Sequence, residues 1–88
     1  MQYTIKTNIY KKPETTEVEF LINVSEIHSK ISAKGENIQT QTEYNNDEGA
    51  VKTAFIFDTD APGSLMEDIR EVMSKHDNDG NYDWEDIS

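Results

Sequence analysis

The stretch Val51-Lys52-Thr53-Ala54-Phe55-Ile56-Phe57-Asp58 has four consecutive apolar residues at its centre, so a strand formed by it presents apolar side chains on both faces. Such a strand is typical of the middle of a sheet that is covered by another layer. The segment Ala61-Pro62-Gly63 then interrupts the pattern. We therefore expect residues 51–58 to form a central strand that is covered on one side by a helix.

The covering helix is predicted to follow directly. Ser64-Leu65-Met66-Glu67 has the Ser-x-x-Glu spacing of a capping box, in which the two polar side chains satisfy free backbone amides. The residues beyond it divide into an apolar face and a charged face at helical spacing. The apolar face is Leu65, Met66, Ile69, Val72 and Met73, and the charged face is Glu67, Asp68, Arg70, Glu71 and Lys75.

Strand signals dominate the sequence before residue 51. Tyr3 to Tyr10 alternates and stops before Pro13, which cannot donate to a strand ladder. Residues 18–24 alternate almost perfectly and form the clearest strand pattern. Residues 25–33 fit strand alternation and a helical face equally well, and we expect a strand there. A short helix over residues 25–34 that ends at Gly35 is the alternative.

Two turn segments organise the middle of the chain. Lys34-Gly35-Glu36-Asn37 is expected to be a hairpin loop that leads into an alternating strand from Ile38 to Tyr44. Asn45 to Gly49 is rich in residues that accept turn conformations. The predicted fold class is α+β: a four- or five-stranded antiparallel sheet with one C-terminal helix packed on it. Residues 1–76 are expected to form a single domain, and residues 77–88 an acidic C-terminal tail.

Charge is the strongest compositional signal. The 88 residues include 18 Asp and Glu against 8 Lys and Arg, a net charge of −10. Residues 1–44 carry six acids and five bases, whereas residues 45–88 carry twelve acids and three bases. Such a field repels nucleic acid and anionic membranes and attracts basic protein surfaces. We expect a basic partner protein and no direct contact with nucleic acid or a membrane.

Motifs for catalysis or cofactor binding are missing from the sequence. There is no cysteine, no glycine-rich phosphate loop and no spaced histidine cluster. The start of the chain has no apolar signal segment, and no stretch is apolar enough to cross a bilayer. We therefore expect a cytoplasmic protein that is not an enzyme and has no cofactor.

Residues 75–86 resemble a calcium loop of the EF-hand or dockerin type. If Gly80 is the loop glycine, the ligand positions fall on Asp77, Asp79, the carbonyl of Asn81, Asp83 and Asp86. Lys75 then occupies the first ligand position, and no second helix follows. A calcium-binding module is therefore an alternative function, and the leading interpretation has no metal site.

The predicted partner-binding surface consists of acids at a strand end, on the outer face of the helix and in the tail. They are Asp58, Asp60, Glu67, Asp68, Glu71, Asp77, Asp79, Asp83, Glu85 and Asp86. With the helix over the sheet, these acids are expected to project to one side, where they can occupy sites that otherwise hold phosphates. Tyr82 and Trp84 lie among them as candidate aromatic anchors. The alternative is that both fold back and fix the tail to the domain.

These patterns favour a non-enzymatic acidic inhibitor that occupies the basic, nucleic-acid-binding surface of a partner protein. Its size and charge are similar to those of phage-encoded DNA mimics, such as anti-CRISPR and anti-restriction proteins. Bacterial immunity proteins and antitoxins share the same size and charge and form another alternative. The likeness is one of protein class, since no diagnostic motif connects the chain to one family.

Overall fold

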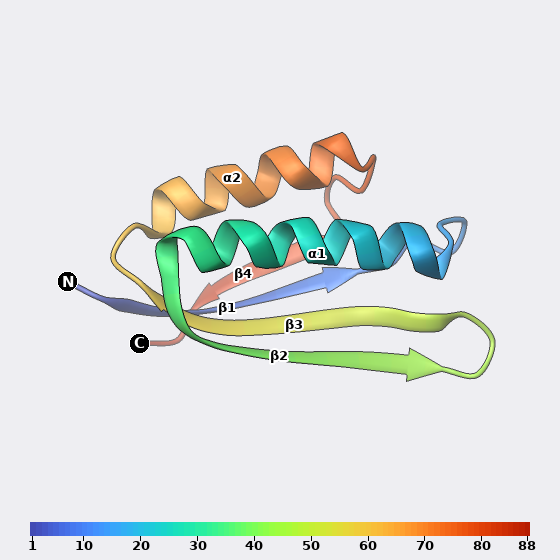
Figure 1. Cartoon of the computed structure of the whole chain (residues 1–88), viewed down its shortest axis with the longest axis horizontal. Helices are drawn as coiled ribbons and strands as arrows, with labels where there is room; N and C mark the ends of the chain where they lie inside the picture. The colour runs from blue at the N-terminus through green and yellow to red at the C-terminus, as the bar shows by residue number, and fades with distance from the viewer.

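The computed structural model describes residues 1–88 as six elements: β1 (Tyr3–Tyr10), α1 (Glu17–Lys34), β2 (Gly35–Asn45), β3 (Gly49–Thr59), α2 (Pro62–Lys75) and β4 (Tyr82–Asp86). The strands form one antiparallel sheet in the order β2-β3-β1-β4. Both helices cover the same face of this sheet (Figure 1). This βαββαβ order is that of the ferredoxin-like fold. Neither helix is long and apolar enough to span a membrane.

The hydrophobic core lies between the sheet and the two helices. In the central pair of strands, Ile5 is opposite Phe57 and Thr7 is opposite Phe55, and all four side chains are buried. Alternation along the strands places their other side chains on the opposite, uncovered face. The prediction of a central strand at residues 51–58 is confirmed, since β3 lies between β2 and β1.

The prediction of a single, C-terminal helix was wrong, because α1 occupies the region predicted as strand at residues 18–24 and 25–33. Its buried residues are three or four positions apart, at Phe20, Asn23, Ile27 and Ile31. The strand pattern arose because α1 also carries apolar residues on its exposed side. Over 18 residues the helical period prevails over the strand period. The short helix predicted as the alternative for residues 25–34 is the second half of α1.

Both ends of α1 have clear local causes. Thr16 is the N-cap, and its hydroxyl accepts a hydrogen bond from the amide of Glu19 at 3.2 Å. Gly35 follows the last helical residue, and its amide donates to the carbonyl of Ile31. The predicted hairpin loop at residues 34–37 is therefore wrong, because β2 begins at Gly35 directly after the helix.

The predicted helix after β3 is confirmed as α2, but its predicted cap is wrong. The N-cap is Ala61, without a side-chain bond, and Pro62 occupies the first turn. Ser64 instead accepts a hydrogen bond from Lys34, and Glu67 pairs with Arg70. The capping-box spacing is thus used for contacts on the helix surface.

The C-terminal residues 77–88, predicted as an acidic tail, contain strand β4. This strand pairs with β1, with Tyr82 opposite Ile9 and Trp84 opposite Thr7. Trp84 also contacts Phe57 edge-on, with ring centroids 5.9 Å apart. Strand β4 therefore completes the sheet on the side away from β2.

Candidate interaction surface

The structure separates the predicted acidic residues instead of collecting them on one side. Asp58 and Asp83 lie on the uncovered face of the sheet, because their neighbours along the strand, such as Phe57 and Trp84, pack on the side of the helices. Glu67, Asp68 and Glu71 lie on α2, on the other side of the molecule. The expectation that these acids project to one side does not match this geometry.

Several of these carboxylates already have partners within the chain. Asp58 accepts hydrogen bonds from Asn37 at 2.9 Å and Thr4 at 2.7 Å, which hold its pKa below the ordinary value. Asp68 lies 2.7 Å from Lys34. These two residues connect segments of the fold, so they are less free to bind a partner.

A similar hydrogen-bond network surrounds Asp83 on the uncovered face of β4. Desolvation raises the pKa of Asp83, but hydrogen bonds from Tyr10 at 2.8 Å and Asn8 at 2.7 Å outweigh it and leave the pKa lowered. The carboxylate of Asp86 accepts a bond from the amide of Ser88. Glu85, between them, is exposed.

The two predicted aromatic anchors do not project from the surface. Tyr82 and Trp84 are half-buried and pack against the hydrophobic core. Their burial follows from the alternation along β4, which turns both rings toward the helices.

The residues of the alternative calcium site do not converge. Asp77 and Asp79 lie between α2 and β4, whereas Asp83 and Asp86 lie three positions apart in a strand and so face opposite sides of the sheet. No group of three or more histidine or acidic side chains is arranged to hold a metal ion. The carbonyl of Asn81, the predicted ligand, accepts a hydrogen bond from the backbone amide of Tyr10 at 2.8 Å.

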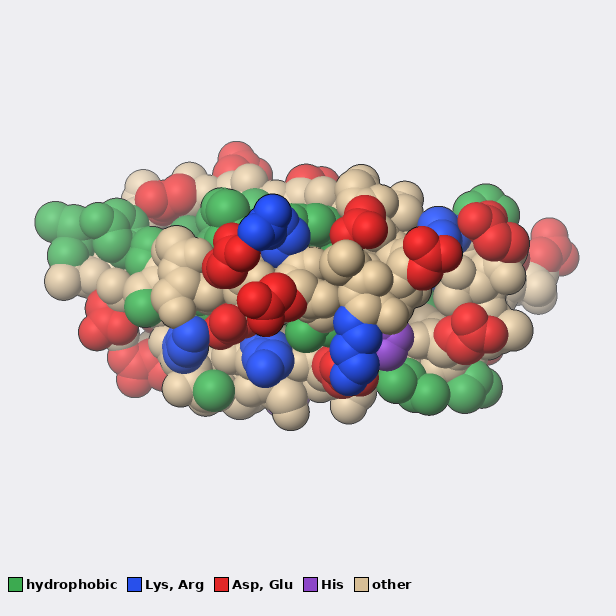
Figure 2. All heavy atoms as spheres, turned by 90° about the horizontal axis from the view of Figure 1, so that it is seen from above, with side chains coloured by type: hydrophobic (Ala, Val, Ile, Leu, Met, Phe, Trp, Pro, Cys, Tyr) green, Lys and Arg blue, Asp and Glu red, His purple; other side chains and the backbone are tan.

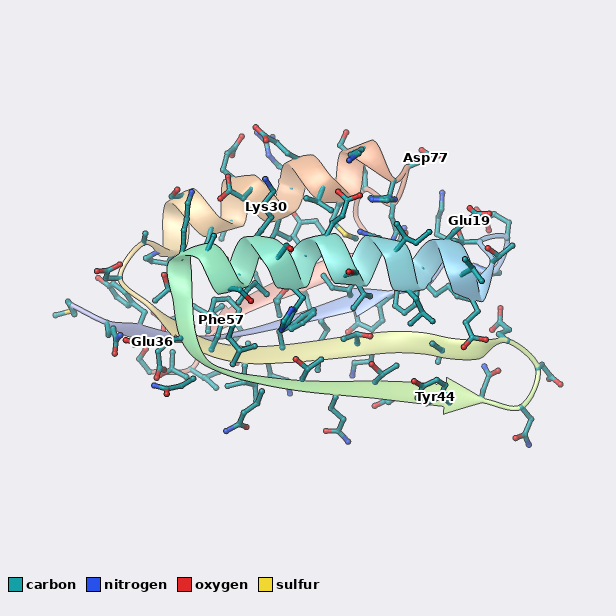
Figure 3. The ribbon with its side chains drawn as sticks, in the orientation of Figure 1. Glu19, Lys30, Glu36, Tyr44, Phe57 and Asp77 are labelled. Carbon is teal, nitrogen blue, oxygen red and sulfur yellow. The ribbon has the colours of Figure 1, made fainter.

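A different set of acids does gather, at one end of the elongated molecule. This end is formed by the loop after β1, the first turn of α1, the β2–β3 turn and the loop after α2, and Figure 3 shows Glu19 and Asp77 there. We call the following residues the acidic end: Glu14, Glu17, Glu19, Asp47, Glu48, Asp77 and Asp79. Three of them come from the first half of the chain, where six acids are nearly balanced by five bases.

Lys11 and Lys12 connect the loops of the acidic end through hydrogen bonds and ion pairs. The side chain of Lys11 is 3% exposed, donates to the carbonyls of Lys12 and Thr15, and lies 3.3 Å from Glu48. Lys12 lies 3.6 Å from Asp77 and 3.8 Å from Glu14. Hydrogen bonds from Asn45 and then Lys11 lower the pKa of Glu48. Both cations are thus engaged internally, and the acidic end keeps a surplus of negative charge.

An apolar patch adjoins the acidic end on the outer side of α1. Val18, Leu21 and Ile22 are 67%, 40% and 51% exposed and lie opposite the buried face of the helix. Figure 2 shows hydrophobic side chains exposed among acidic ones at this end. Exposed apolar side chains with a charged rim are typical of protein-binding surfaces.

A groove of about 330 Å³ lies beside this patch, between α1 and the end of α2. Its walls include the apolar side chains of Phe20 and Ile22 and the acids Glu19 and Asp77, together with Lys75 and His76. The groove thus extends the candidate interaction surface inward.

Acidification should weaken a link between the helices at Glu26. Its carboxylate accepts a hydrogen bond from Lys75 at 3.1 Å and lies 3.0 Å from His76 Nε2, and these contacts lower its pKa. A lowered pKa in the folded state gives stability that is present above the unfolded pKa of about 4.3 and lost as the pH falls through the folded pKa.

We therefore expect the variant Glu26→Gln to be less stable than the wild type at pH 7, with a difference that shrinks once the pH falls below the unfolded pKa of about 4.3. Urea denaturation at a series of pH values measures this. A difference that is constant down to pH 3 would contradict the ion-pair assignment.

Comparison with known proteins shows the fold alone. No family model matches the chain, and no curated protein is similar to it in sequence. Solved structures that resemble it include the de novo designed protein Foldit4, with a TM-score of 0.70 and 13% identity over 100% of this chain and 98% of that one. The 30S ribosomal protein S6 of Thermotoga maritima has a TM-score of 0.65 and 11% identity over 98% and 88%.

A third similar structure is a dimeric ferredoxin-like protein of unknown function from Thermobifida fusca, with a TM-score of 0.62 and 9% identity over 99% and 91% of the two chains. All three likenesses extend over nearly the whole chain, and the likeness to the ribosomal protein agrees with a two-helix ferredoxin-like fold. They support the correction from one helix to two.

Proposed function

We propose that this protein is a non-enzymatic inhibitor that binds a basic, nucleic-acid-binding surface of a partner protein through its acidic end. The observation that carries the proposal is the convergence of seven acids from four segments, with two lysines that are both engaged internally. The class that fits is the phage-type DNA mimic, such as an anti-CRISPR or anti-restriction protein. Its place of action is the cytoplasm.

Electrostatics gives this surface its preference for a basic partner. Carboxylates held close together repel one another in the free protein, and a basic surface relieves that repulsion on binding. The field also steers a basic partner toward this end before contact. The N-terminus of α1 carries a partial positive charge, which lets Glu17 and Glu19 lie together in its first turn.

The apolar patch is proposed to supply binding affinity, which exposed charges alone do not provide. Exposed carboxylates govern association rate and salt dependence, whereas buried apolar contacts contribute most of the affinity in protein interfaces. Val18, Leu21 and Ile22 are placed to make such contacts next to the charged rim. This combination distinguishes a specific protein interface from a surface that is acidic only for solubility.

The proposal is tested by two variants of equal charge. The first, Glu19→Gln/Asp47→Asn/Asp79→Asn, neutralises acids of the acidic end whose carboxylates have no hydrogen-bond partner in the fold. The control, Glu36→Gln/Asp60→Asn/Glu85→Gln, removes the same charge elsewhere. Each tagged protein is used to capture partners from a nuclease-treated bacterial lysate, with elution by salt or by added DNA and detection by mass spectrometry.

We expect wild type and control to retain a basic nucleic-acid-binding protein that both salt and DNA release, and the first variant to lose at least about tenfold in capture. Equal capture by the two variants would show that net charge alone is responsible. A partner that is indifferent to salt would exclude the electrostatic mechanism.

A further inference from the structure

Strand β2 is an edge of the sheet with no partner strand on its outer side. It pairs only with β3 and extends over eleven residues, with irregularities between Glu36 and Gln39 and between Glu43 and Tyr44 that leave Gln39–Glu43 as its regular part. Its segment Asn37-Ile38-Gln39-Thr40-Gln41-Thr42 contains no charge, proline or glycine. Natural edge strands are usually kept from pairing by charges, proline or short length. The opposite edge, β4, follows this rule, since three of its five residues are Asp83, Glu85 and Asp86.

We propose that β2 pairs antiparallel with β2 of a second copy of this chain, so that two sheets join into one. The two-fold axis passes at Thr40, which places Thr40 opposite Thr40 of the other copy. Gln39 is then opposite Gln41, and Ile38 is opposite Thr42. This axis keeps the helices of both copies on the same face of the joined sheet. The backbone groups on the outer side of β2 gain hydrogen-bond partners along the new ladder.

The charges along β2 permit this pairing. The paired segment Ile38–Thr42 carries no charge, and Glu36 and Glu43 lie beyond its two ends, so no two carboxylates face each other within the register centred on Thr40. The antiparallel arrangement also directs the two acidic ends away from each other, because each lies at the C-terminal end of its β2 (Figure 1). A second copy therefore fits this edge despite the net charge of −10.

Two side chains on the helix side of β2 also favour a second copy of this chain as the partner. Thr40 is opposite the buried Phe55 in the ladder, and Tyr44 is opposite the buried Ala50, so both lie on the face that the helices cover. The ring of Tyr44 is 66% exposed. A second copy of β2 covers part of this ring and allows a hydroxyl contact between the two threonines.

Sedimentation measures the assembly directly. We expect the wild type to form a dimer of twice the 10.1 kDa chain mass as its concentration rises from micromolar to millimolar. Salt should strengthen this dimer, since it screens the repulsion between two acidic copies. Binding to a basic partner has the opposite salt dependence, so the two proposals fail independently.

Variants at Thr40 test the register. Thr40→Lys places two like charges opposite each other and should weaken the dimer at least about tenfold, whereas Thr40→Val should preserve it. Circular dichroism confirms that each variant is folded. A wild type that stays monomeric at millimolar concentration, or an unaffected Thr40→Lys dimer, would overturn the proposal.

Cross-linking gives an independent readout, because the chain has no cysteine of its own. Residues directly opposite in an antiparallel pair have Cα atoms about 4.5–5.5 Å apart, which suits a disulfide. Thr40→Cys should therefore form a covalent dimer under mild oxidation. The control Asp47→Cys, in the β2–β3 turn, should remain monomeric at the same concentration. Equal cross-linking of the two variants would indicate random collisions and reject the two-fold arrangement.

Discussion

Replacement of Phe20 by alanine should lower the free energy of unfolding by about 3–5 kcal/mol. Phe20 is 1% exposed and packs in the core beneath α1. By contrast, Val18→Ala and Ile22→Ala should each change stability by less than about 1 kcal/mol, because both side chains lie on the exposed side of the helix. This difference follows from the helical period and is the sharpest test of α1.

Urea denaturation of the three variants measures these differences, with the slope of the transition as a check on two-state behaviour. A strand at residues 18–24 places Val18, Phe20 and Ile22 on one face. Such a strand therefore predicts a large loss of unfolding free energy for all three variants. Similar losses at the three positions would contradict the helix.

The parts of the fold that the sequence predicts well have one apolar face. Strand β1 begins and ends where its alternation does, and α2 has a single apolar face on which Leu65, Ile69, Val72 and Met73 are buried and only Met66 is exposed. In α1, the exposed Val18 and Ile22 add to the buried Phe20 and the partly buried Val24 to produce an alternation of period two. The apolar patch that marks the interaction surface is thus the feature that obscured the helix.

One local signal for α1 was nevertheless present in the sequence. Thr16-Glu17-Val18-Glu19 has the Thr-x-x-Glu spacing of a capping box, and no glycine or proline occurs between Pro13 and Gly35. The structure confirms the first half of this box, since Thr16 caps the amide of Glu19. An uninterrupted segment of this length after a cap favours a helix over two short strands.

The acidic end could not be found by counting charges along the chain. Glu14 and Glu19 precede Asp77 by more than fifty residues, and only the βαββαβ topology brings these segments to one end. A count of charges along the chain instead emphasises the acids of residues 82–86. There, the alternation of Tyr82 and Trp84 with Asp83 and Glu85 is the period of an edge strand, which accounts for the charge without a binding role.

Replacement of Asn78 by alanine is expected to cost about 2–4 kcal/mol of stability, because one buried and one partly buried acceptor lose their donor. Asn78 is 5% exposed, and its Nδ2 donates to the carbonyl of Tyr10 at 3.0 Å and to Asn23 Oδ1 at 3.1 Å. It therefore connects the loop after α2 to the end of β1 and to the buried side of α1. Asn78→Asp should cost at least as much at neutral pH, because a buried carboxylate then faces two oxygens.

A double-mutant cycle with Asn23→Ala separates the amide pair from the bond to Tyr10. The two single losses should exceed the loss in the double variant by about 0.5–3 kcal/mol, since the substitutions remove one shared bond. Additive losses would show that the two amides do not stabilise each other.

Asn78 also lies between two acids of the acidic end, Asp77 and Asp79, so its effect should extend to binding. Asn78→Ala leaves the net charge unchanged and removes the contacts that hold this loop against β1 and α1. If the proposed interface depends on the position of these carboxylates, partner capture should fall along with stability. Capture that is unaffected in folded Asn78→Ala protein would show that charge at this end acts without a fixed geometry, as expected for steering but not for mimicry of ordered phosphates.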